Sequence, residues 1–389
     1  MSRTDDLIAR YCPNGVEMDT IGNLCKINRG RVMSKDYLAA NQGDYPVYSS
    51  QTANEGMLGK IKTYDYDGEY LTWTTDGAYA GSVFYRKGKF SITNICGLLD
   101  LQSDKLLIKF LYYYLGNVTK NYVNAGMGNP KLMSNVMERI KVAVPPLAVQ
   151  EEIVNILDSF TLLEAELEAE LEARKKQYEH YRDELLNIAP EAYRPIIDIA
   201  DTFIGLVTTM TTHYVEDGVK LLNNCNIKEN HIKITKQIFL DREFAKSNAS
   251  RQHKLGDIIT VHTGDVGTSA VITKEFDGSL GFATIVTRIK NQNVVLPQFI
   301  AYYLNSSINK RAIQSMIKSD RNNLNIKDFN KLKVPVPPLA EQERIVGILD
   351  KFDALVNDIS DGLPAEINAR RQQYEYYRDK LLNFEPMAA

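Results

Sequence analysis

Residues 144–151 read VPPLAVQE, and residues 336–343 read VPPLAEQE. In both copies an Ile-Val pair follows, and a phenylalanine comes later, Phe160 in the first copy and Phe352 in the second. Four further tripeptides recur in the same order: Ile-Leu-Asp (156–158 and 348–350), Gln-Tyr-Glu (177–179 and 373–375), Tyr-Arg-Asp (181–183 and 377–379) and Leu-Leu-Asn (185–187 and 381–383). So many identities at nearly one offset indicate that the chain carries one structural module twice.

Each copy predicts a long amphipathic helix. Apolar residues recur in steps of three and four from Ile153 to Ile188, and again from Ile345 to Phe384. This narrow stripe is close to the heptad spacing of coiled coils, so it favours packing of the two helices on each other over ordinary packing inside one globule. The offset grows from 192 residues at Pro145 to 196 at Tyr178, and four residues are close to one helical turn, so the stripe keeps its phase.

The two helices are expected to differ in continuity. No proline or glycine occurs from Leu147 to Ile188, so a helix from Gln150 to Ile188 would run unbroken for about 57 Å. The second copy contains Gly362 and Pro364. Because proline lacks a backbone donor and clashes with the preceding turn, we predict a break near Asp361–Pro364, with Pro364 in the first turn of the resumed helix.

Weaker matches place a globular region before each helix. In each region two strand-like runs are predicted to form a hairpin, turning at Lys87-Gly88 in the first and at Asp277-Gly278 in the second. The chain thus divides into two globular domains and two helical regions, with predicted bounds of 1–146, 147–189, 190–338 and 339–389. Between the matched positions the globular regions differ almost entirely, whereas the helices are nearly copied.

Composition indicates a two-domain protein of a reducing compartment. A chain of 389 residues is too long for one compact core and fits two domains with connectors. The first ten residues include Asp5 and Asp6, and no stretch approaches the ~18–20 apolar residues of a membrane span, so we expect a cytoplasmic protein without a secretory leader. The four cysteines are scattered, which favours reduced thiols over disulfides or a zinc site.

Charge alternates in step with the repeat. Residues 1–150 carry a net charge of +3, residues 151–188 carry −7, residues 189–336 carry +5 and residues 337–389 carry −4. Basic globular regions are suited to approach phosphate, while acidic helices are suited to a protein partner. Ordinary scatter of a few charges is the competing explanation. An excess this small also implies weak DNA affinity without a partner that adds cations.

Known catalytic motifs do not occur in the sequence. There is no GxxxxGK[ST] phosphate loop, no GxGxxG and no GxSxG. Asn129-Pro130-Lys131 lacks the second proline and the aromatic residue of an adenine-methyltransferase tetrapeptide. The histidines show no metal-ligand spacing, and His262 fits a strand end entering a turn better than a catalytic pair. We therefore expect no catalytic residue and no metal site in this chain.

The remaining polar chemistry suits DNA binding. Several loops carry Arg, Asn, Gln, Ser and Thr, the side chains that read base edges in the major groove, and basic loops before short helices can seat phosphate. An ordinary surface loop is the alternative for each. The candidate DNA-binding residues are Arg29, Arg31, Lys35, Ser49, Ser50, Gln51, Thr74, Thr75, Asn129, Lys131, Thr208, Thr209, Thr211, Asn223, Asn224, His262, Thr263, Arg321, Asn322 and Asn323.

The duplicated motif closely resembles the specificity subunit of type I restriction-modification systems, and the resemblance covers nearly the whole chain. It implies an α/β (α+β) fold: two target-recognition domains with twisted mixed sheets, joined by two long helices packed as an antiparallel coiled coil in a pseudo-twofold repeat. The recognition loops of that family vary too much for a transfer of residues, so the candidate residues above rest on the loops alone.

The resemblance also implies a function. A specificity subunit has no catalytic activity of its own; it binds double-stranded DNA, two methyltransferase subunits and, in the full complex, motor-nuclease subunits. Each recognition domain would read one half of a bipartite target, and the helices would set the spacing between the halves. S-adenosylmethionine, ATP and magnesium are expected on the partner subunits, with no cofactor in this chain.

Two other classes of protein remain open at the level of sequence. A stand-alone DNA-binding or scaffolding protein with a coiled-coil spacer would bind its target tightly without any enzyme. A nuclease of a kind not evident in the motifs would cleave DNA alone with magnesium, although no cluster of paired carboxylates and a lysine stands out.

Overall fold

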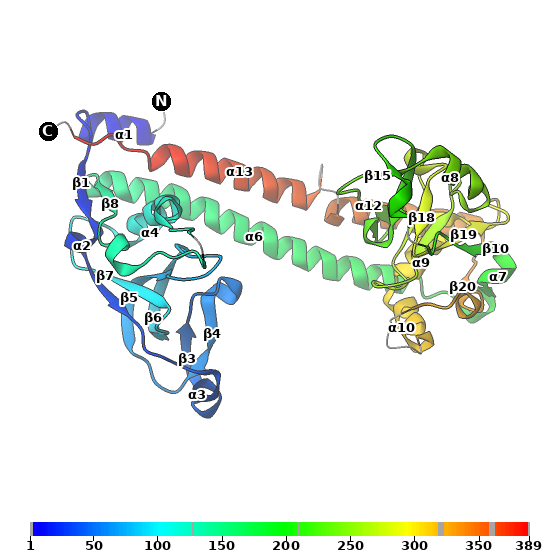
Figure 1. Cartoon of the computed structure of the whole chain (residues 1–389), viewed down its shortest axis with the longest axis horizontal. Coiled ribbons are helices and arrows are strands. Elements are labelled where there is room, and N and C mark those ends of the chain that lie inside the picture. The colour runs from blue at the N-terminus through cyan, green and yellow to red at the C-terminus, as the bar shows by residue number, and fades with distance from the viewer. Residues whose placement is uncertain (1–2, 127, 209, 318–322, 358–361, 388–389) are drawn as a thin grey trace. The chain divides into compact units, whose positions relative to one another are not determined.

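The computed structural model describes residues 3–126, 128–208, 210–317, 323–357 and 362–387. It divides into two compact units. Unit 1 comprises Met1–Leu167 and Ile367–Ala389, and unit 2 comprises Glu168–Glu366. Each unit therefore combines one globular region with adjoining parts of the long helices (Figure 1).

The elements of unit 1 are α1 (Arg3–Tyr11), β1 (Glu17–Thr20), α2 (Ile21–Leu24), β2 (Cys25–Arg29), α3 (Lys35–Ala40), β3 (Gln42–Tyr48), η1 (Ala53–Gly56), β4 (Met57–Ile61), β5 (Tyr66–Thr74), β6 (Val83–Ile92), β7 (Cys96–Leu101), α4 (Ile108–Val118), η2 (Thr119–Tyr122), α5 (Ser134–Met137), β8 (Lys141–Val144), the first part of α6 (Leu147–Leu185) and most of α13 (Leu363–Leu381).

Unit 2 holds the rest of α6 and then η3 (Pro190–Ala192), β9 (Tyr193–Pro195), α7 (Ile196–Ile199), β10 (Ala200–Ile204), η4 (Thr211–His213), β11 (Tyr214–Val215), β12 (Val219–Asn223), η5 (Asn224–Asn226), β13 (Ile227–Lys228), β14 (His231–Ile232), β15 (Ile238–Leu240), α8 (Arg242–Ser247), η6 (Ala249–Arg251), β16 (Ile258–Val261), β17 (Ser269–Val271), η7 (Lys274–Phe276), β18 (Leu280–Phe282), β19 (Thr284–Ile289), α9 (Pro297–Asn305), α10 (Ser307–Met316), α11 (Ile326–Phe329), β20 (Lys333–Pro335) and α12 (Leu339–Asn357).

The globular region of unit 1 is built on a six-stranded sheet in the order β2-β7-β5-β6-β3-β4. Its strands pair antiparallel except β3 and β6, which are parallel. Helix α4 contacts β5 and β6, over a core that contains the fully buried side chains of Trp73, Phe110 and Leu111. The sheet is therefore mixed, as predicted, and helix α4 packs against it.

The globular region of unit 2 contains two four-stranded sheets. One has the order β10-β19-β16-β17 and is antiparallel; the other has the order β11-β15-β12-β18, with β12 and β18 parallel. Helix α9 packs on β17 and on α12, and the fully buried Phe299 and Phe329 lie in the core that they share. A sheet with a helix against it thus recurs in the second globular region.

Both hairpins predicted from the sequence are wrong. Strand β6 continues through Lys87-Gly88, because it pairs along this stretch with β5 upstream, and the chain turns instead at residues 93–95. In unit 2 the Asp277-Gly278 pair does form a turn, and Gly278 has a φ of +78°. The strands on either side of that turn belong to different sheets, since β17 pairs with β16 and β18 pairs with β12. A local turn signal does not determine strand partners.

The helices follow the predicted difference in continuity. Helix α6 is a single helix of 39 residues, Leu147–Leu185, close to the predicted span. In the second copy α12 ends at Asn357, and α13 begins at Leu363 with Pro364 in its first turn. The predicted break is confirmed there, although Asp361 lies outside the described residues.

In unit 1 the first part of α6 packs antiparallel on α13. The ring of Phe160 stacks on Tyr377 with centroids 5.5 Å apart, and it lies edge-on to Tyr374 at 6.4 Å. One turn further along α6, Glu164 pairs with Arg371 at 2.5 Å. Rising numbers on α6 therefore meet falling numbers on α13, which confirms antiparallel packing within this unit.

In unit 2 the remainder of α6 packs on α12. The ring of Phe352 lies 5.8 Å from Tyr181 and 6.5 Å from Tyr178. The Tyr178 hydroxyl also donates a hydrogen bond to Asp353 at 3.4 Å. Phe352 is the counterpart of Phe160 in the repeat, so the repeated phenylalanine meets a repeated tyrosine on the other helix in both units.

The repeated glutamine ties the start of each long helix to its globular region. Gln150 is fully buried; its amide donates to the carbonyl oxygens of Lys105 at 2.8 Å and Pro145 at 2.6 Å, and its carbonyl accepts from the Leu107 N–H at 2.7 Å. Gln342 repeats this pattern with Val294, Pro337 and Leu296. Buried backbone groups need hydrogen-bond partners, and the glutamine of the repeated Pro-Pro-Leu-Ala-x-Gln motif supplies them. The motif is thus the joint between each long helix and its globular region.

The last residue of α13 and the residues after it complete the core of unit 1. Leu381 and Leu382 are buried in that core, and the ring of Phe384 lies 6.2 Å from Phe110. Beyond them, the N–H of Met387 donates to the carbonyl of Val16 at 2.9 Å. Among the described residues, no helix has an apolar stretch of the length that a bilayer span requires.

Candidate nucleic-acid interface

In unit 1 the predicted loops converge on the turn at residues 93–95. The N–H of Asn94 donates to the carbonyl of Arg31 at 3.1 Å, and the Thr93 hydroxyl donates to Ser49 at 3.1 Å. On the other side, the N–H of Thr75 donates to the Ile95 carbonyl at 3.3 Å. Three loops that are distant in sequence therefore meet at this turn.

A fourth loop joins these three through an ion pair. The N–H of Leu132 donates to the Thr75 carbonyl at 2.9 Å, which places Lys131 beside Asp76. The Lys131 ammonium lies 3.7 Å from the Asp76 carboxylate, which also accepts from the Thr75 hydroxyl at 2.7 Å. Lys131 and the neighbouring Asn129 are exposed. Because an exposed ion pair is weak, Lys131 is available to an incoming phosphate or base.

Other candidates of unit 1 serve the loops themselves. Thr74 is fully buried and its hydroxyl donates to the Tyr79 carbonyl. The Gln51 amide donates to the Met57 carbonyl at 2.6 Å, and Ser50 beside it is half-buried. Lys35 is exposed at the first position of α3, whose N-cap is Ser34.

Two candidate arginines of unit 1 differ in how exposed their side chains are and in their hydrogen bonds. Arg29 is half-buried, and its Nη1 has no hydrogen-bond partner among the residues that the structure describes. Arg31 is exposed; hydrogen bonds to Tyr37 at 3.2 Å and Asp65 at 3.1 Å, in that order of importance, raise the pKa of its guanidinium. Arg31 is therefore a fixed surface cation in a loop that meets the Ser49 and Thr75 loops at the turn of residues 93–95.

In unit 2 four candidates form one hydrogen-bonded cluster. The Asn224 amide donates to the Thr263 carbonyl at 2.8 Å, and the Thr263 hydroxyl donates to Asn323 at 2.6 Å. His262 Nδ1 lies 2.8 Å from the same hydroxyl oxygen. Since Thr263 has one hydroxyl proton and gives it to Asn323, His262 Nδ1 donates, and the other ring nitrogen, Nε2, is left as an acceptor. Burial lowers the pKa of His262, which favours this neutral form.

The remaining candidates of unit 2 surround this cluster or lie outside the described residues. Asn223 closes a capping box with Asn226 at the start of η5. Thr208 and Thr211 are exposed after Leu206, whose carbonyl accepts from the Ala283 N–H at 3.2 Å. Three further candidates are outside the described ranges: Thr209, Arg321 and Asn322.

The two loop clusters occupy the same place in the two copies of the fold. Leu132 donates its N–H to the Thr75 carbonyl, and Leu324 donates to the His262 carbonyl at 3.0 Å. An antiparallel bridge links Asp76 to Lys131 in unit 1, and another links Thr263 to Asn323 in unit 2. The backbone arrangement is thus conserved between the copies, while the side chains that it presents are different.

The residues of the first cluster that lie in the turn at residues 93–95 were not predicted from the sequence. Thr93 and Asn94 were hidden inside a segment assigned to a single strand, although two small polar residues in succession are a turn signal. Asp76 directly follows the candidates Thr74 and Thr75 but was not itself a candidate. No group of three or more His, Cys, Asp or Glu side chains suited to a metal occurs in the part of the chain that the structure describes.

The architecture and the paired loop clusters define a duplicated two-domain protein, in which one scaffold is used twice with different side chains in its loops. The sequence matches the family described as the type I restriction modification DNA specificity domain over residues 13–173 and 195–369. The chain therefore belongs to this family and contains its domain twice.

Relatives support the same assignment. The chain is 32% identical over 373 residues to S.MpnORF507P of Mycoplasma pneumoniae, named as a type I specificity subunit. The matched region covers 94% of this chain and 96% of the relative. The chain is 44% identical over 175 residues to the type I restriction enzyme MpnII specificity subunit of the same organism, covering 44% of this chain and 53% of the relative.

Solved structures share the fold. The crystal structure of the type I restriction-modification system S subunit from M. genitalium has a TM-score of 0.57 at 16% identity, covering 95% of this chain and 97% of that chain. A chain from a study of complex assembly and conformational transition of the type I system has a TM-score of 0.61 at 15% identity, covering 95% and 98%.

Proposed function

We propose that this chain is the DNA-recognition subunit of a type I restriction-modification complex, with each globular region reading one half of a bipartite target. The observation that carries the proposal is the equivalence of the two loop clusters. The same backbone frame presents Asp76 and Lys131 beside the buried Thr75 in one copy, and His262, Thr263 and Asn323 in the other. Different side chains on one frame are what two different half-sites require.

The side chains of the clusters are suited to both parts of DNA recognition. Lysine and arginine hold phosphate and fix the position of the protein on the duplex, while amide, hydroxyl and imidazole groups read base edges. In unit 2 the free acceptor of His262 would receive a hydrogen bond from a base amino group, as adenine N6 or cytosine N4 provides in the major groove. In unit 1 Arg31 and Lys131 would supply the phosphate contacts.

We further propose that the long helices set the spacing of the half-sites and dock two methyltransferase subunits. The net charge of −7 over residues 151–188 and of −4 over residues 337–389 suits a protein partner better than DNA. Motor-nuclease subunits would join the same complex. Adenine methylation and ATP-dependent cleavage would then reside in partner chains, together with S-adenosylmethionine, ATP and magnesium, and the complex would work in the cytoplasm.

Methylome sequencing tests this function. A strain that carries this chain with its methyltransferase should show adenine methylation at one bipartite sequence, and a strain without it should not. Exchange of residues 190–338 for those of a relative should change one half of that sequence only. A change in both halves would refute the modular reading. Tight, salt-resistant and sequence-specific binding by the purified chain alone would instead favour a stand-alone DNA-binding protein.

A further inference from the structure

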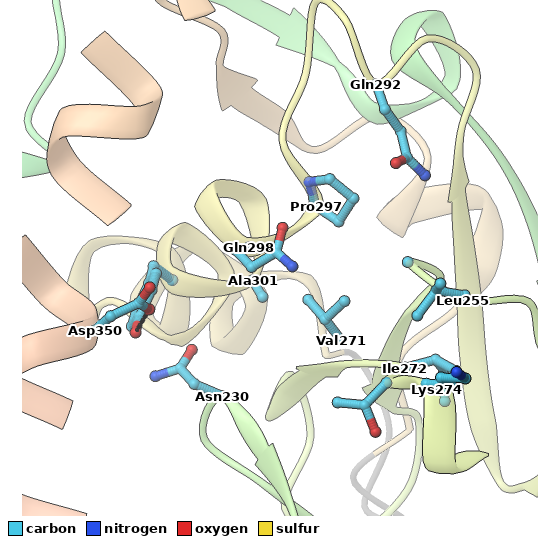
Figure 2. A pocket seen from close by; sticks show the side chains of 13 residues that line it. Asn230, Leu255, Val271, Ile272, Lys274, Gln292, Pro297, Gln298, Ala301 and Asp350 are labelled. Carbon is cyan, nitrogen blue, oxygen red and sulfur yellow. Dashed lines mark hydrogen bonds between the residues drawn. The ribbon is translucent and has the colours of Figure 1, made fainter. Parts of the chain in front are cut away.

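Unit 2 contains a cavity of about 550 Å³ between its globular region and α12. Figure 2 shows Asp350 and Asn230 at one end of it and Lys274 near the other. Between them lie apolar side chains, including Val271, and the amide of Gln298. The cavity thus has apolar walls with polar side chains among them, a carboxylate at one end and the Lys274 ammonium near the other.

The first copy of the repeat shows what an aspartate in this position binds. Asp158 is the counterpart of Asp350, and both of its oxygens are engaged. The Tyr113 hydroxyl donates to Oδ1 at 2.7 Å, and the Lys109 ammonium pairs with Oδ2 at 2.5 Å. The ammonium also lies 6.0 Å from the centre of the Tyr85 ring. A lysine and an aromatic ring of the chain itself therefore occupy the space beside Asp158.

The second copy keeps one half of this arrangement. The Tyr302 hydroxyl donates to Asp350 Oδ1 at 2.6 Å, as Tyr113 does to Asp158. The other oxygen, Oδ2, has no partner among the residues that the structure describes, and Asp350 is exposed. Gln298 stands where the first copy has Lys109, because the two residues directly precede the matched Phe299 and Phe110.

A second substitution opens the same space. Tyr85 pairs with Leu71 across the sheet, and Val271 pairs with Ile258. Leu71 and Ile258 each lie four residues before the matched Thr75 and His262, so Val271 takes the place of Tyr85. The second copy has therefore lost both the cation and the ring, and the cavity lies where they would be.

We propose that this cavity receives a lysine or arginine side chain of a methyltransferase subunit, whose cation pairs with Asp350 Oδ2. The inference rests on the proposed function, since it assumes that such subunits dock here. The apolar walls suit the methylene stem of a long basic side chain, and the amide oxygen of Gln298 is a second acceptor for its head. The two docking sites then differ, because the first copy fills its own site with Lys109.

Two substitutions test the inference from opposite directions. D350N removes the charge with almost no change of shape. Q298K restores the lysine of the first copy, so the chain would pair with Asp350 itself and exclude the partner. The matched control is D158N, which breaks the internal pair of the first copy. Binding of the methyltransferase subunit of the same system is measured by titration calorimetry, and the stoichiometry by native mass spectrometry.

The second methyltransferase subunit is expected to bind roughly tenfold more weakly to D350N and to Q298K, because a charge-assisted contact across the interface is lost. D158N should retain the wild-type affinity and lose thermal stability. Wild-type affinity in both D350N and Q298K would overturn the inference and leave the proposed function standing. Failure of the unaltered chain to bind any methyltransferase subunit would overturn the proposed docking as well. Since Q298K only adds a lysine at a partly exposed site, it keeps the test decisive if D350N misfolds.

Discussion

The side-chain carbonyl of Gln342 accepts the backbone N–H of Leu296 at 2.9 Å, across 46 residues of chain. Leu296 is the N-cap of α9, so this bond fixes the start of a core helix of the globular region against the start of α12. Gln150 and Leu107 form the same bond at the start of α4. The motif that reveals the repeat in the sequence is therefore the joint that attaches each globular region to its long helix.

Replacement of this glutamine should destabilise unit 2. Q342L leaves the N–H of Leu296 and the carbonyls of Val294 and Pro337 without their partner, and buried groups without partners are costly. We expect a loss of about 2–5 kcal/mol in the free energy of unfolding, measured by chemical denaturation. The neighbouring exposed Glu343 provides the control, since E343Q should leave stability unchanged. Equal stability of Q342L and the wild type would show that the joint contributes nothing.

Single substitutions in the loop clusters should affect one half of the target each. K131A should weaken contacts to the first half-site, and N323A those to the second, by roughly 1–3 kcal/mol where a base edge is read. Because Lys131 also contacts phosphate in the proposed function, K131A should reduce the salt dependence of binding, whereas N323A should not. The measurement is competition binding of the assembled complex with duplexes altered in one half at a time. Identical profiles for the two variants would contradict separate readout.

The stability of unit 2 should fall in weak acid. His253 is buried, with Nδ1 2.8 Å from the Ser279 hydroxyl and Nε2 without a partner among the described residues. Burial lowers the pKa of His253 from 6.5 to about 4. The charge of Asp257 raises this pKa and the charge of Arg288 lowers it, and both effects are smaller than that of burial. In the unfolded chain His253 therefore binds a proton below pH 6.5, whereas in the folded chain it binds one only below about pH 4.

This shift predicts a loss of about 3 kcal/mol between those two pH values, and full stability above pH 6.5. H253Q removes the titrating group, so its unfolding free energy should depend less on pH across this window. H231Q, at an exposed histidine, is the comparison and should keep the wild-type dependence. Chemical denaturation at a series of pH values gives the answer; the same slope in H253Q and the wild type would rule out this histidine as the source.

The link between α12 and α13 should control the spacing of the half-sites. The second copy has four more residues than the first, and deletion of residues 358–361 restores the shorter length. Under the proposed function, the deletion should change the number of base pairs between the two half-sites and leave both half-sequences intact, because no residue of either loop cluster is altered. Methylome sequencing reports both properties. An unchanged spacer would refute the role of the helices in setting it.

The helices were predictable because their determinants are local. The steps of three and four residues and the absence of proline and glycine over 147–188 were enough to predict α6, and Pro364 was enough to place the start of α13. The strand partners were not predictable in this way, because they depend on distant segments. The stretch that forms β6 was divided into two strands at Lys87-Gly88, since nothing local to this pair reveals that β5 runs beside the whole of it.

The candidate residues show the same limit. The composition of single loops singled out His262, Thr263, Asn224 and Asn323, and the fold brings these four together. It could not show that Thr74 is buried, because burial depends on where the neighbouring loop passes. Nor could it reveal the cavity beside Asp350, which follows from comparing the two copies in three dimensions. Contact with DNA by any of these residues remains a prediction.

The closing of the unit 1 core by Leu381, Leu382 and Phe384 has a consequence for how the protein is made. A ribosome releases residues in order, so the first globular region emerges early with Phe110 and its neighbours still uncovered. Its core stays partly uncovered while the whole second region is synthesised. The core is covered only when α13 and the residues after it are made. A translation product that stops before α13 would expose an apolar surface that chaperones and proteases recognise. The stability of the first globular region therefore depends on completion of the second.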